Sequence, residues 1–148
     1  HRDGVASFLD GASVAFRGSA PTGAEAGDGF WFAPAVVLAA PGDRVAPDAV
    51  YGPIVAVLPF DDEADAIRLA NDTIYGLAGS IWTENLGRAV RVSRGVRSGV
   101  LSVNSHSSVR YLAPFGGMKA SGLGRELGPD AAEHFTETKN VFYATDAS

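Results

Sequence analysis

The sequence predicts an α/β fold with a parallel-type sheet flanked by helices, and three observations support this prediction. Its 148 residues include 46% hydrophobic and 20% charged residues, which is typical of one globular domain that can bury a core. Strand-like and helix-like patterns alternate along residues 54–103, as they do in βαβ units. A final alternating run predicts one more strand at the end of the chain.

The first part of the chain is expected to contain the end of a helix and three strands. Apolar residues in 1–9 have the spacing of the last turns of a helix. Residues 13–17 alternate, and residues 30–40 and 54–60 are rich in β-branched and aromatic side chains, so each run predicts a strand. Residues 18–29 are rich in Gly, Ala and Pro and predict a loop.

The middle of the chain predicts two helices and two strands. Asp61 or Asp62 is placed to cap a helix that continues to residue 70, because acidic residues crowd its first turn. Residues 78–82 and 100–103 predict strands, and Thr83 is expected to cap the helix between them.

The last part predicts a glycine-rich stretch over residues 116–128, a short helix near residues 129–135, and a strand over residues 136–144.

Composition excludes several classes of function. Twelve Lys and Arg against 17 Asp and Glu give a net charge of −5 without a basic block, so we expect no nucleic-acid partner. The longest apolar runs are far too short to cross a bilayer and no signal-peptide pattern opens the chain, so we expect a cytoplasmic protein without a membrane partner. The absence of cysteine leaves no disulfide, thiolate metal site or Cys nucleophile in this sequence. His1 stands where Met would begin a gene product, so we expect a piece of something longer.

Three features of the sequence are candidates for binding or metal sites. GLGRELG at residues 122–128 has one residue too many for a dinucleotide-binding fingerprint and no apolar strand directly before it, so we reject that interpretation. The three histidines lack the spacing of metal ligands, and we expect no metal site. His106 lies in a polar loop directly after the strand at residues 100–103, at the strand end where α/β sheets bind ligands. The residues alone leave open whether the loop at residues 104–115 binds a ligand or only connects two elements.

Four segments carry a resemblance to a known family. They read YGPIV at residues 51–55, ANDTIYGLA at residues 70–78, GVLSVN at residues 99–104 and PFGGMKASGLGRE at residues 114–126. In order and spacing they resemble the C-terminal third of NAD(P)-dependent aldehyde dehydrogenases, over residues 4–143.

The resemblance implies that residues 1–135 are the C-terminal portion of that family's catalytic domain, and that residues 136–148 are an oligomerisation strand and tail. A homo-oligomer, either dimer or tetramer, is therefore expected. In the family a Cys thiolate attacks the aldehyde, hydride passes to NAD or NADP, and a Glu-activated water hydrolyses the thioester. The nucleophile, the general base and the cofactor domain lie upstream in the family, so this chain is expected to hold no catalytic residue and to be inactive alone.

The resemblance also assigns candidate binding residues. Tyr51 matches an aromatic residue beside the nicotinamide ribose, so it is the expected cofactor-binding residue. Phe115 matches an aromatic residue that walls the substrate tunnel, and Ser107 and Val109 belong to a loop that supplies other tunnel side chains.

Further positions concern the assembly and the cofactor. Arg125 and Glu137 match a pair that meets across the dimer interface in the family. The family usually has a Glu that binds the ribose hydroxyls where this sequence has Ala49, and Asp48 is one position away. Loss of such a contact would weaken the binding of the cofactor by about 1.5–3 kcal/mol.

The preferred interpretation is thus a C-terminal fragment of an enzyme that oxidises an aldehyde to a carboxylic acid with NAD or NADP. One alternative is a free-standing, non-catalytic module that binds a partner subunit through the oligomerisation surface. A related acylating dehydrogenase or acyl-phosphate reductase is a third, weaker interpretation, because SGLGRE at residues 121–126 resembles the hydrolytic group more.

Overall fold

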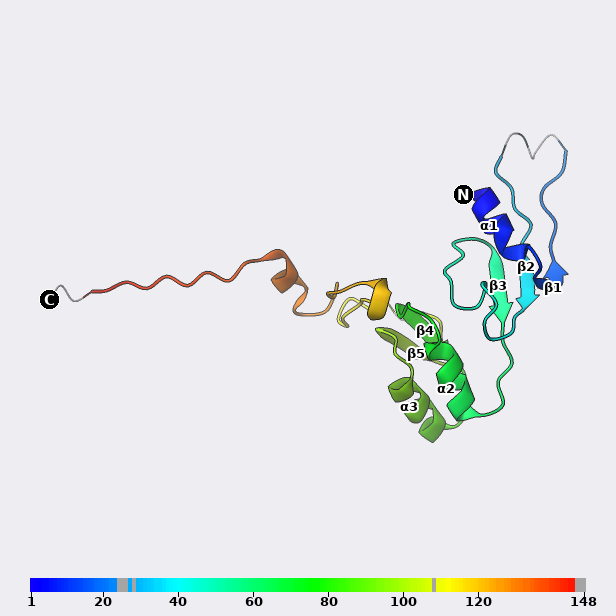
Figure 1. Ribbon diagram of the computed structural model, residues 1–148. Helices are drawn as coiled ribbons and strands as arrows, with labels where there is room; N and C mark the ends of the chain where they lie inside the picture. The colour runs from blue at the N-terminus through cyan, green and yellow to red at the C-terminus, as the bar shows by residue number, and fades with distance from the viewer. Residues whose placement is uncertain (24–26, 28, 108, 146–148) are drawn as a thin grey trace.

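The computed structural model describes residues 1–23, 27, 29–107 and 109–145, which form two halves with a small sheet in each (Figure 1). Residues 24–26 and 28 of the expected loop, and residues 146–148 of the expected tail, lie outside the described residues. The elements of the first half are α1 (Arg2–Ala6), η1 (Ser7–Leu9), β1 (Ser13–Arg17), β2 (Ala35–Leu38) and β3 (Ile54–Val57). Those that follow are α2 (Glu63–Asn71), β4 (Ala78–Ile81), α3 (Leu86–Gly95), β5 (Val100–Val103), η2 (Lys119–Ser121) and η3 (Ala131–Phe135).

The sheet of the first half has β2 at its centre. β1 pairs with β2 in the antiparallel direction and β3 pairs with it in parallel. Val37 of β2 is fully buried and forms a core with Ala39 and Val45, against which η1 packs Phe8 and Leu9. The fold of this half therefore depends on one covered face of the sheet.

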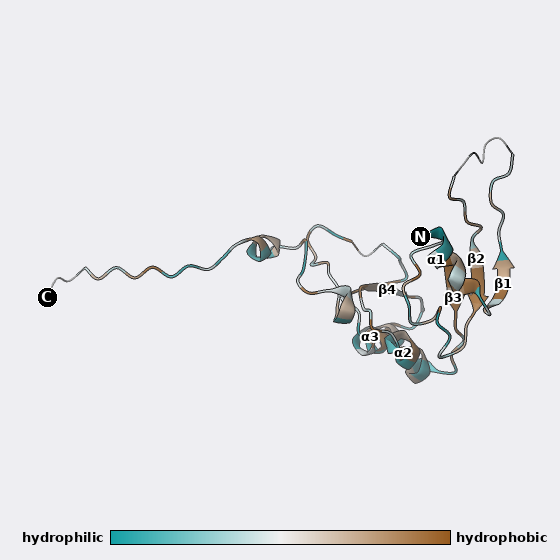
Figure 2. Ribbon diagram, turned by 45° about the horizontal axis from the view of Figure 1, so that its top comes forward, coloured by the Kyte–Doolittle hydropathy of each residue, from teal (hydrophilic) through white to brown (hydrophobic). Residues whose placement is uncertain are grey.

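The other face of the same sheet is open and apolar. The register places Val36 of β2 beside Val55 of β3 and Phe16 of β1, and Leu38 beside Val57, so these side chains share one face. All but Val36 are exposed. Figure 2 shows β2 and β3 in the brown of hydrophobic residues, and β1 in a paler brown with a teal end.

The second half contains the parallel pair β4–β5 with α2 and α3 beside it (Figure 1). The Asp62 carboxylate caps α2 by accepting a hydrogen bond of 2.8 Å from the Asp65 amide, as predicted. Glu63 of α2 accepts two hydrogen bonds from Arg91 of α3, at 2.6 Å and 2.8 Å, so a charged pair joins the helices.

The α/β class is confirmed, but the arrangement of the strands differs from the expected single sheet. β3 pairs only with β2, and β4 pairs only with β5 among the described residues, so the chain divides its strands between two sheets. The alternation of apolar residues indicates that a strand exists, but the partner of a strand is set by contacts distant in sequence.

Two local predictions need correction. Thr83 does not cap α3: the helix begins two residues later than expected, and Asn85 Oδ1 accepts the capping hydrogen bond from the Arg88 amide at 2.8 Å. The expected strand at residues 136–144 is not assigned. The described residues from 136 to 145 run away from the body without a sheet partner (Figure 1), because none of the described strands lies beside them. The predicted short helix before them is the 3₁₀ helix η3.

Candidate functional site

Two adjoining hollows bring together residues that the sequence had singled out separately. One hollow, of about 370 Å³, is lined by Tyr51 and Ala49, and the other, of about 320 Å³, is lined by Phe115 and Arg125. Both hollows also share Leu77 and Ser121 in their walls. The predicted cofactor-binding residue Tyr51 and the predicted substrate-binding residue Phe115 therefore line neighbouring hollows that share Leu77, the residue directly before β4, and Ser121.

Tyr51 stands in an unusual backbone conformation at the first hollow. Its φ of +50° is left-handed, and its side chain is 80% exposed. The His1 ring donates from Nε2 to the Tyr51 carbonyl oxygen at 2.8 Å, which holds this turn in place. At the next residue, Gly52, a Cβ would lie 2.4 Å from Val5, so only glycine allows the turn to approach α1 this closely. The phenol ring is thus presented outward on a fixed backbone.

Asp48 lines the same hollow as Tyr51, and its carboxylate faces an arginine. Asp48 Oδ2 lies 3.7 Å from Arg44 Nε, and both side chains are exposed. Ala49 lines the hollow but offers no hydrogen-bond acceptor in its side chain. The hollow can therefore offer an aromatic surface, while the carboxylate of Asp48 already faces an arginine.

Phe115 is held at the second hollow by a short bridge of backbone. Phe115 and Glu126 exchange two backbone hydrogen bonds of 2.7 Å, which close the glycine-rich segment into a loop. The Arg125 guanidinium lies inside this loop and donates from Nη1 to the carbonyls of Gly117 and Gly124, at 2.8 Å and 2.6 Å. Arg125 thus has a role within its own chain besides any contact that it makes with another subunit.

The predicted interface pair is not assembled within this chain. Glu137 lies in the extended segment after η3 and is exposed, and no interaction joins it to Arg125 among the described residues. Their meeting across a subunit interface stays a prediction.

Ser107 and Val109 lie apart from the Phe115 hollow. Both are exposed in the loop after β5, and neither lines either hollow. Arg110 turns back onto this loop, donating from Nη1 to Ser107 Oγ at 3.2 Å and to the Val109 carbonyl at 2.9 Å. The structure thus places Tyr51 and Phe115 around shared residues but does not bring the loop residues to them.

Sequence reasoning missed Leu77 and Ser121 as members of the site. Ser121 Oγ accepts a hydrogen bond of 3.0 Å from the Gly76 amide, which joins the glycine-rich loop to the entrance of β4. Both residues stood inside the quoted motifs, but a motif does not show which two segments will touch.

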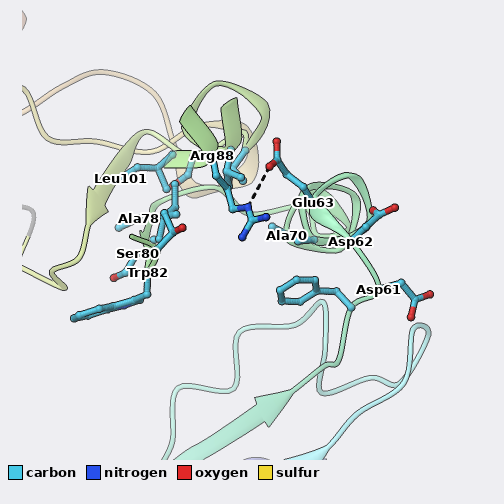
Figure 3. A pocket seen from close by; sticks show the side chains of 17 residues that line it. Asp61, Asp62, Glu63, Ala70, Ala78, Ser80, Trp82, Arg88 and Leu101 are labelled. Atoms are coloured by element: carbon cyan, nitrogen blue, oxygen red, sulfur yellow. Dashed lines mark hydrogen bonds and ion pairs between the residues drawn. The ribbon is translucent and has the colours of Figure 1, made fainter. Parts of the chain in front are cut away.

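A third hollow, of about 620 Å³, lies between α2, α3 and the β4–β5 pair (Figure 3). Asp61, Asp62 and Glu63 lie at one end and Trp82 and Leu101 at the other, with the Glu63–Arg88 contact of 3.4 Å between them. None of the predicted site residues lines it. The hydrogen bonds from Arg91 lower the pKa of Glu63, and the same pair raises the pKa of Arg91. We interpret this charged group as a structural link between the two helices.

Metal and membrane sites find no support in the part of the chain that is described. No group of three or more His, Asp or Glu side chains gathers there in a way that could hold a metal ion. None of the described helices has the length and apolarity that a membrane crossing requires.

Comparison with known proteins gives the family. The model of the aldehyde dehydrogenase family matches residues 5–141. An aldehyde dehydrogenase of Emericella nidulans is 40% identical over 90% of this chain and 26% of its own length. A 2-aminomuconic 6-semialdehyde dehydrogenase of a Pseudomonas species is 42% identical over 99% of this chain and 31% of its own length.

A solved structure shows the same fold. The betaine aldehyde dehydrogenase of Staphylococcus aureus, crystallised with NAD⁺, matches 91% of this chain and 29% of its own, with a TM-score of 0.83 and 37% identity. The chain spans less than a third of the length of each of these relatives. By the family match and the shared fold together, this chain belongs to the aldehyde dehydrogenase family.

Proposed function

We propose that this chain is the C-terminal part of an enzyme that oxidises an aldehyde to a carboxylic acid with NAD or NADP. The observation that carries the proposal is the pair of hollows around Leu77 and Ser121, with Tyr51 beside one and Phe115 beside the other. In this arrangement the chain supplies walls for the two reactants, and the thiolate, the general base and the cofactor domain come from sequence outside it. The semialdehyde and betaine aldehyde dehydrogenases among its relatives agree with this reaction class.

The residues present fit one face of a nicotinamide cofactor. When bound, such a cofactor accepts the hydride that leaves the aldehyde carbon. The exposed Tyr51 ring, on a backbone held by His1, offers a flat apolar surface against the ribose. Because Ala49 lacks a carboxylate, we expect the ribose hydroxyls to take part of their hydrogen-bond acceptors from outside this chain. We therefore expect Tyr51 to orient the cofactor, and most of its binding energy to come from the other domain.

Phe115 is proposed to bind the aldehyde. Its ring is partly buried at the rim of the second hollow, and two backbone hydrogen bonds fix its position. A fixed aromatic ring excludes water and limits the width of the substrate chain. Ser107 and Val109 are proposed to join this wall when the loop after β5 packs against the rest of the enzyme.

A homo-oligomer is the proposed assembly. The segment after η3 is extended and exposes Val141, Phe142 and Tyr143, and an extended apolar segment can add a strand to the sheet of a second subunit. The alternative of a free-standing module that binds a partner subunit would use the same surface.

The test uses the protein encoded by the full reading frame that contains this sequence. We expect it to reduce NAD or NADP in the presence of acetaldehyde or benzaldehyde, followed by the absorbance of the reduced nicotinamide. Tyr51→Ala is expected to raise the KM for the cofactor, and Phe115→Ala the KM for benzaldehyde. Phe60→Ala, which alters an exposed ring in a different hollow, is the control and should change neither.

The 148 residues alone are expected to give no aldehyde-dependent reduction. A full-length protein that fails to oxidise any aldehyde, or a reading frame that stops just before His1, would contradict the enzyme and favour the partner-binding module.

A further inference from the structure

The loop between β5 and η2, described at residues 105–107 and 109–118, is flanked on each side by a left-handed residue that is not glycine. Asn104, directly before it, has a φ of +52°, and Lys119, directly after it, has a φ of +56°. Asparagine adopts this conformation more readily than other residues, whereas lysine has no such preference. Strained residues of this kind persist where the surrounding contacts hold them, and they gather at functional sites.

Asn104 is held by the neighbouring strand connection. Its side chain accepts from the Thr83 amide at 2.9 Å and donates to the Thr83 carbonyl at 2.9 Å. Its own amide donates to the Ile81 carbonyl at 2.8 Å. The carboxamide therefore makes the hydrogen bonds that one more strand residue would make, just after the last pair of the β4–β5 ladder, Ile81 and Val103. Because the side chain takes over this pairing, the backbone of Asn104 is free to turn into the loop.

Lys119 is held by the end of α2. Its ammonium donates to the carbonyl oxygens of Asn71 and Thr73, at 3.2 Å and 3.0 Å, and the side chain is partly buried. Asn71 is the last residue of the helix, where the carbonyl groups lack partners within the helix and carry partial negative charge, and Thr73 follows the C-cap Asp72. A cation is the favoured partner at that place, so this contact fixes the far end of the loop to a second rigid element.

All three candidate substrate residues lie between the two anchors. Ser107 and Val109 follow Asn104 by a few residues, and Phe115 precedes Lys119 by four. A loop whose two ends are fixed by side-chain contacts has fewer orientations available than one fixed by its backbone alone. The direction in which these three side chains face thus depends on the two anchors.

We propose that Asn104 and Lys119 are positioning residues that fix the loop at residues 105–118 and so determine which aldehydes the enzyme accepts. Neither residue touches the reacting atoms in this role. The inference rests on the proposed function, because it assumes that the loop forms part of the aldehyde site.

The test measures selectivity in the protein encoded by the full reading frame. Asn104→Gly keeps the left-handed backbone accessible and removes the contacts to Thr83, and Lys119→Met removes the ammonium at nearly constant length. Both are expected to change the ratio of kcat/KM for benzaldehyde to kcat/KM for acetaldehyde by about tenfold, mainly through the KM for benzaldehyde. Lys119→Arg, which keeps a cation, should restore most of the ratio. Thr83→Ala is the matched control, because Asn104 contacts only the backbone of Thr83.

A second measurement on the same variants is independent of activity. Arg110 is exposed within the loop, so the rate of tryptic cleavage after it, followed by mass spectrometry, reports how firmly the loop is held. We expect faster cleavage in Asn104→Gly and Lys119→Met than in the unaltered protein and in Thr83→Ala.

The two measurements separate the possible failures. Unchanged cleavage would show that the two residues do not hold the loop, and faster cleavage with an unchanged ratio would show that they are structural only; either result overturns the inference. A full-length protein without any aldehyde oxidation would instead contradict the proposed function, and with it the claim about selectivity, while the cleavage rates would still decide whether the anchors exist.

Discussion

Gly99 packs directly against the carbonyl group of Gly116. A Cβ placed on Gly99 would lie 1.8 Å from that oxygen, a distance that no pair of unbonded atoms adopts. Gly99 leads into β5, and Gly116 follows Phe115, so this approach fixes the backbone next to Phe115 beside the start of β5. Glycine is required here for space, since neither residue has a left-handed φ.

The variant Gly99→Ala is therefore expected to be strongly destabilising, by about 3 kcal/mol, because the added methyl group meets rigid backbone. Urea unfolding of the 148-residue chain measures this. Gly4→Ala is the matched control: Gly4 lies in α1 with nothing within 4 Å of an added Cβ, so this change should stabilise by roughly 0.5–1 kcal/mol. Equal effects of the two substitutions would argue against the close packing of Gly99.

The pair between Glu63 and Arg91 predicts a dependence of stability on pH. The pKa of Glu63 is lowered chiefly by its hydrogen bonds to Arg91, so the folded state binds this proton less readily than the unfolded state. The resulting stabilisation is complete above the ordinary pKa of a glutamate, about 4.3, and is lost as the pH falls through the lowered value of the folded state. Glu63→Gln should therefore destabilise the chain more at pH 7 than near pH 3. Unfolding by urea at both pH values checks this, with Glu84→Gln as a control at an exposed position that has no ion pair among the described residues. An equal cost of Glu63→Gln at both pH values would contradict the prediction.

The core of the first half depends on one face of its sheet. Val37 is 0% exposed, so Val37→Ala is expected to cost about 2 kcal/mol in the free energy of unfolding. Val55 lies on the open face and is 58% exposed, and Val55→Ala should cost less than about 1 kcal/mol. Urea unfolding of both variants compares a buried and an exposed valine in neighbouring strands. A larger cost at Val55 would mean that the open face is covered in solution.

Arg125 and Glu137 are predicted to couple across a subunit interface in the full-length enzyme. Glu137→Lys is expected to weaken the dimer by more than the 0–1 kcal/mol that is typical of a surface ion pair, and to raise the apparent KM for the cofactor. Arg125→Ala also loses hydrogen bonds to Gly117 and Gly124 within its own chain, so a single substitution does not isolate the pair. A double-mutant cycle with Arg125→Ala and Glu137→Ala, read out by dimer dissociation, removes that contribution. A coupling energy near zero would mean that the two side chains do not meet.

Elements with a strong local pattern were predicted well from the sequence. The strands β1 and β5 have the expected bounds, and Asp62 caps α2, because alternation, spacing and a capping carboxylate act within a few neighbouring residues. The same holds for the motifs that gave the family, since their spacing is a property of the chain alone. Thr83 failed as a cap because Asn85, two residues later, is the more favoured capping residue and accepts the hydrogen bond from the Arg88 amide.

The sequence by itself determined the α/β class, the positions of most helices and strands, and the membership in the aldehyde dehydrogenase family. The tertiary structure decided which strands pair, how Leu77 and Ser121 join the hollows of Tyr51 and Phe115, and where the Arg125 guanidinium lies. The physical reason is the range of the forces involved. Backbone propensity and capping depend on residues a few positions apart. Strand pairing and the contacts of Asn104 and Lys119 join groups 18 to 48 positions apart, and their meeting depends on the packing of the whole chain.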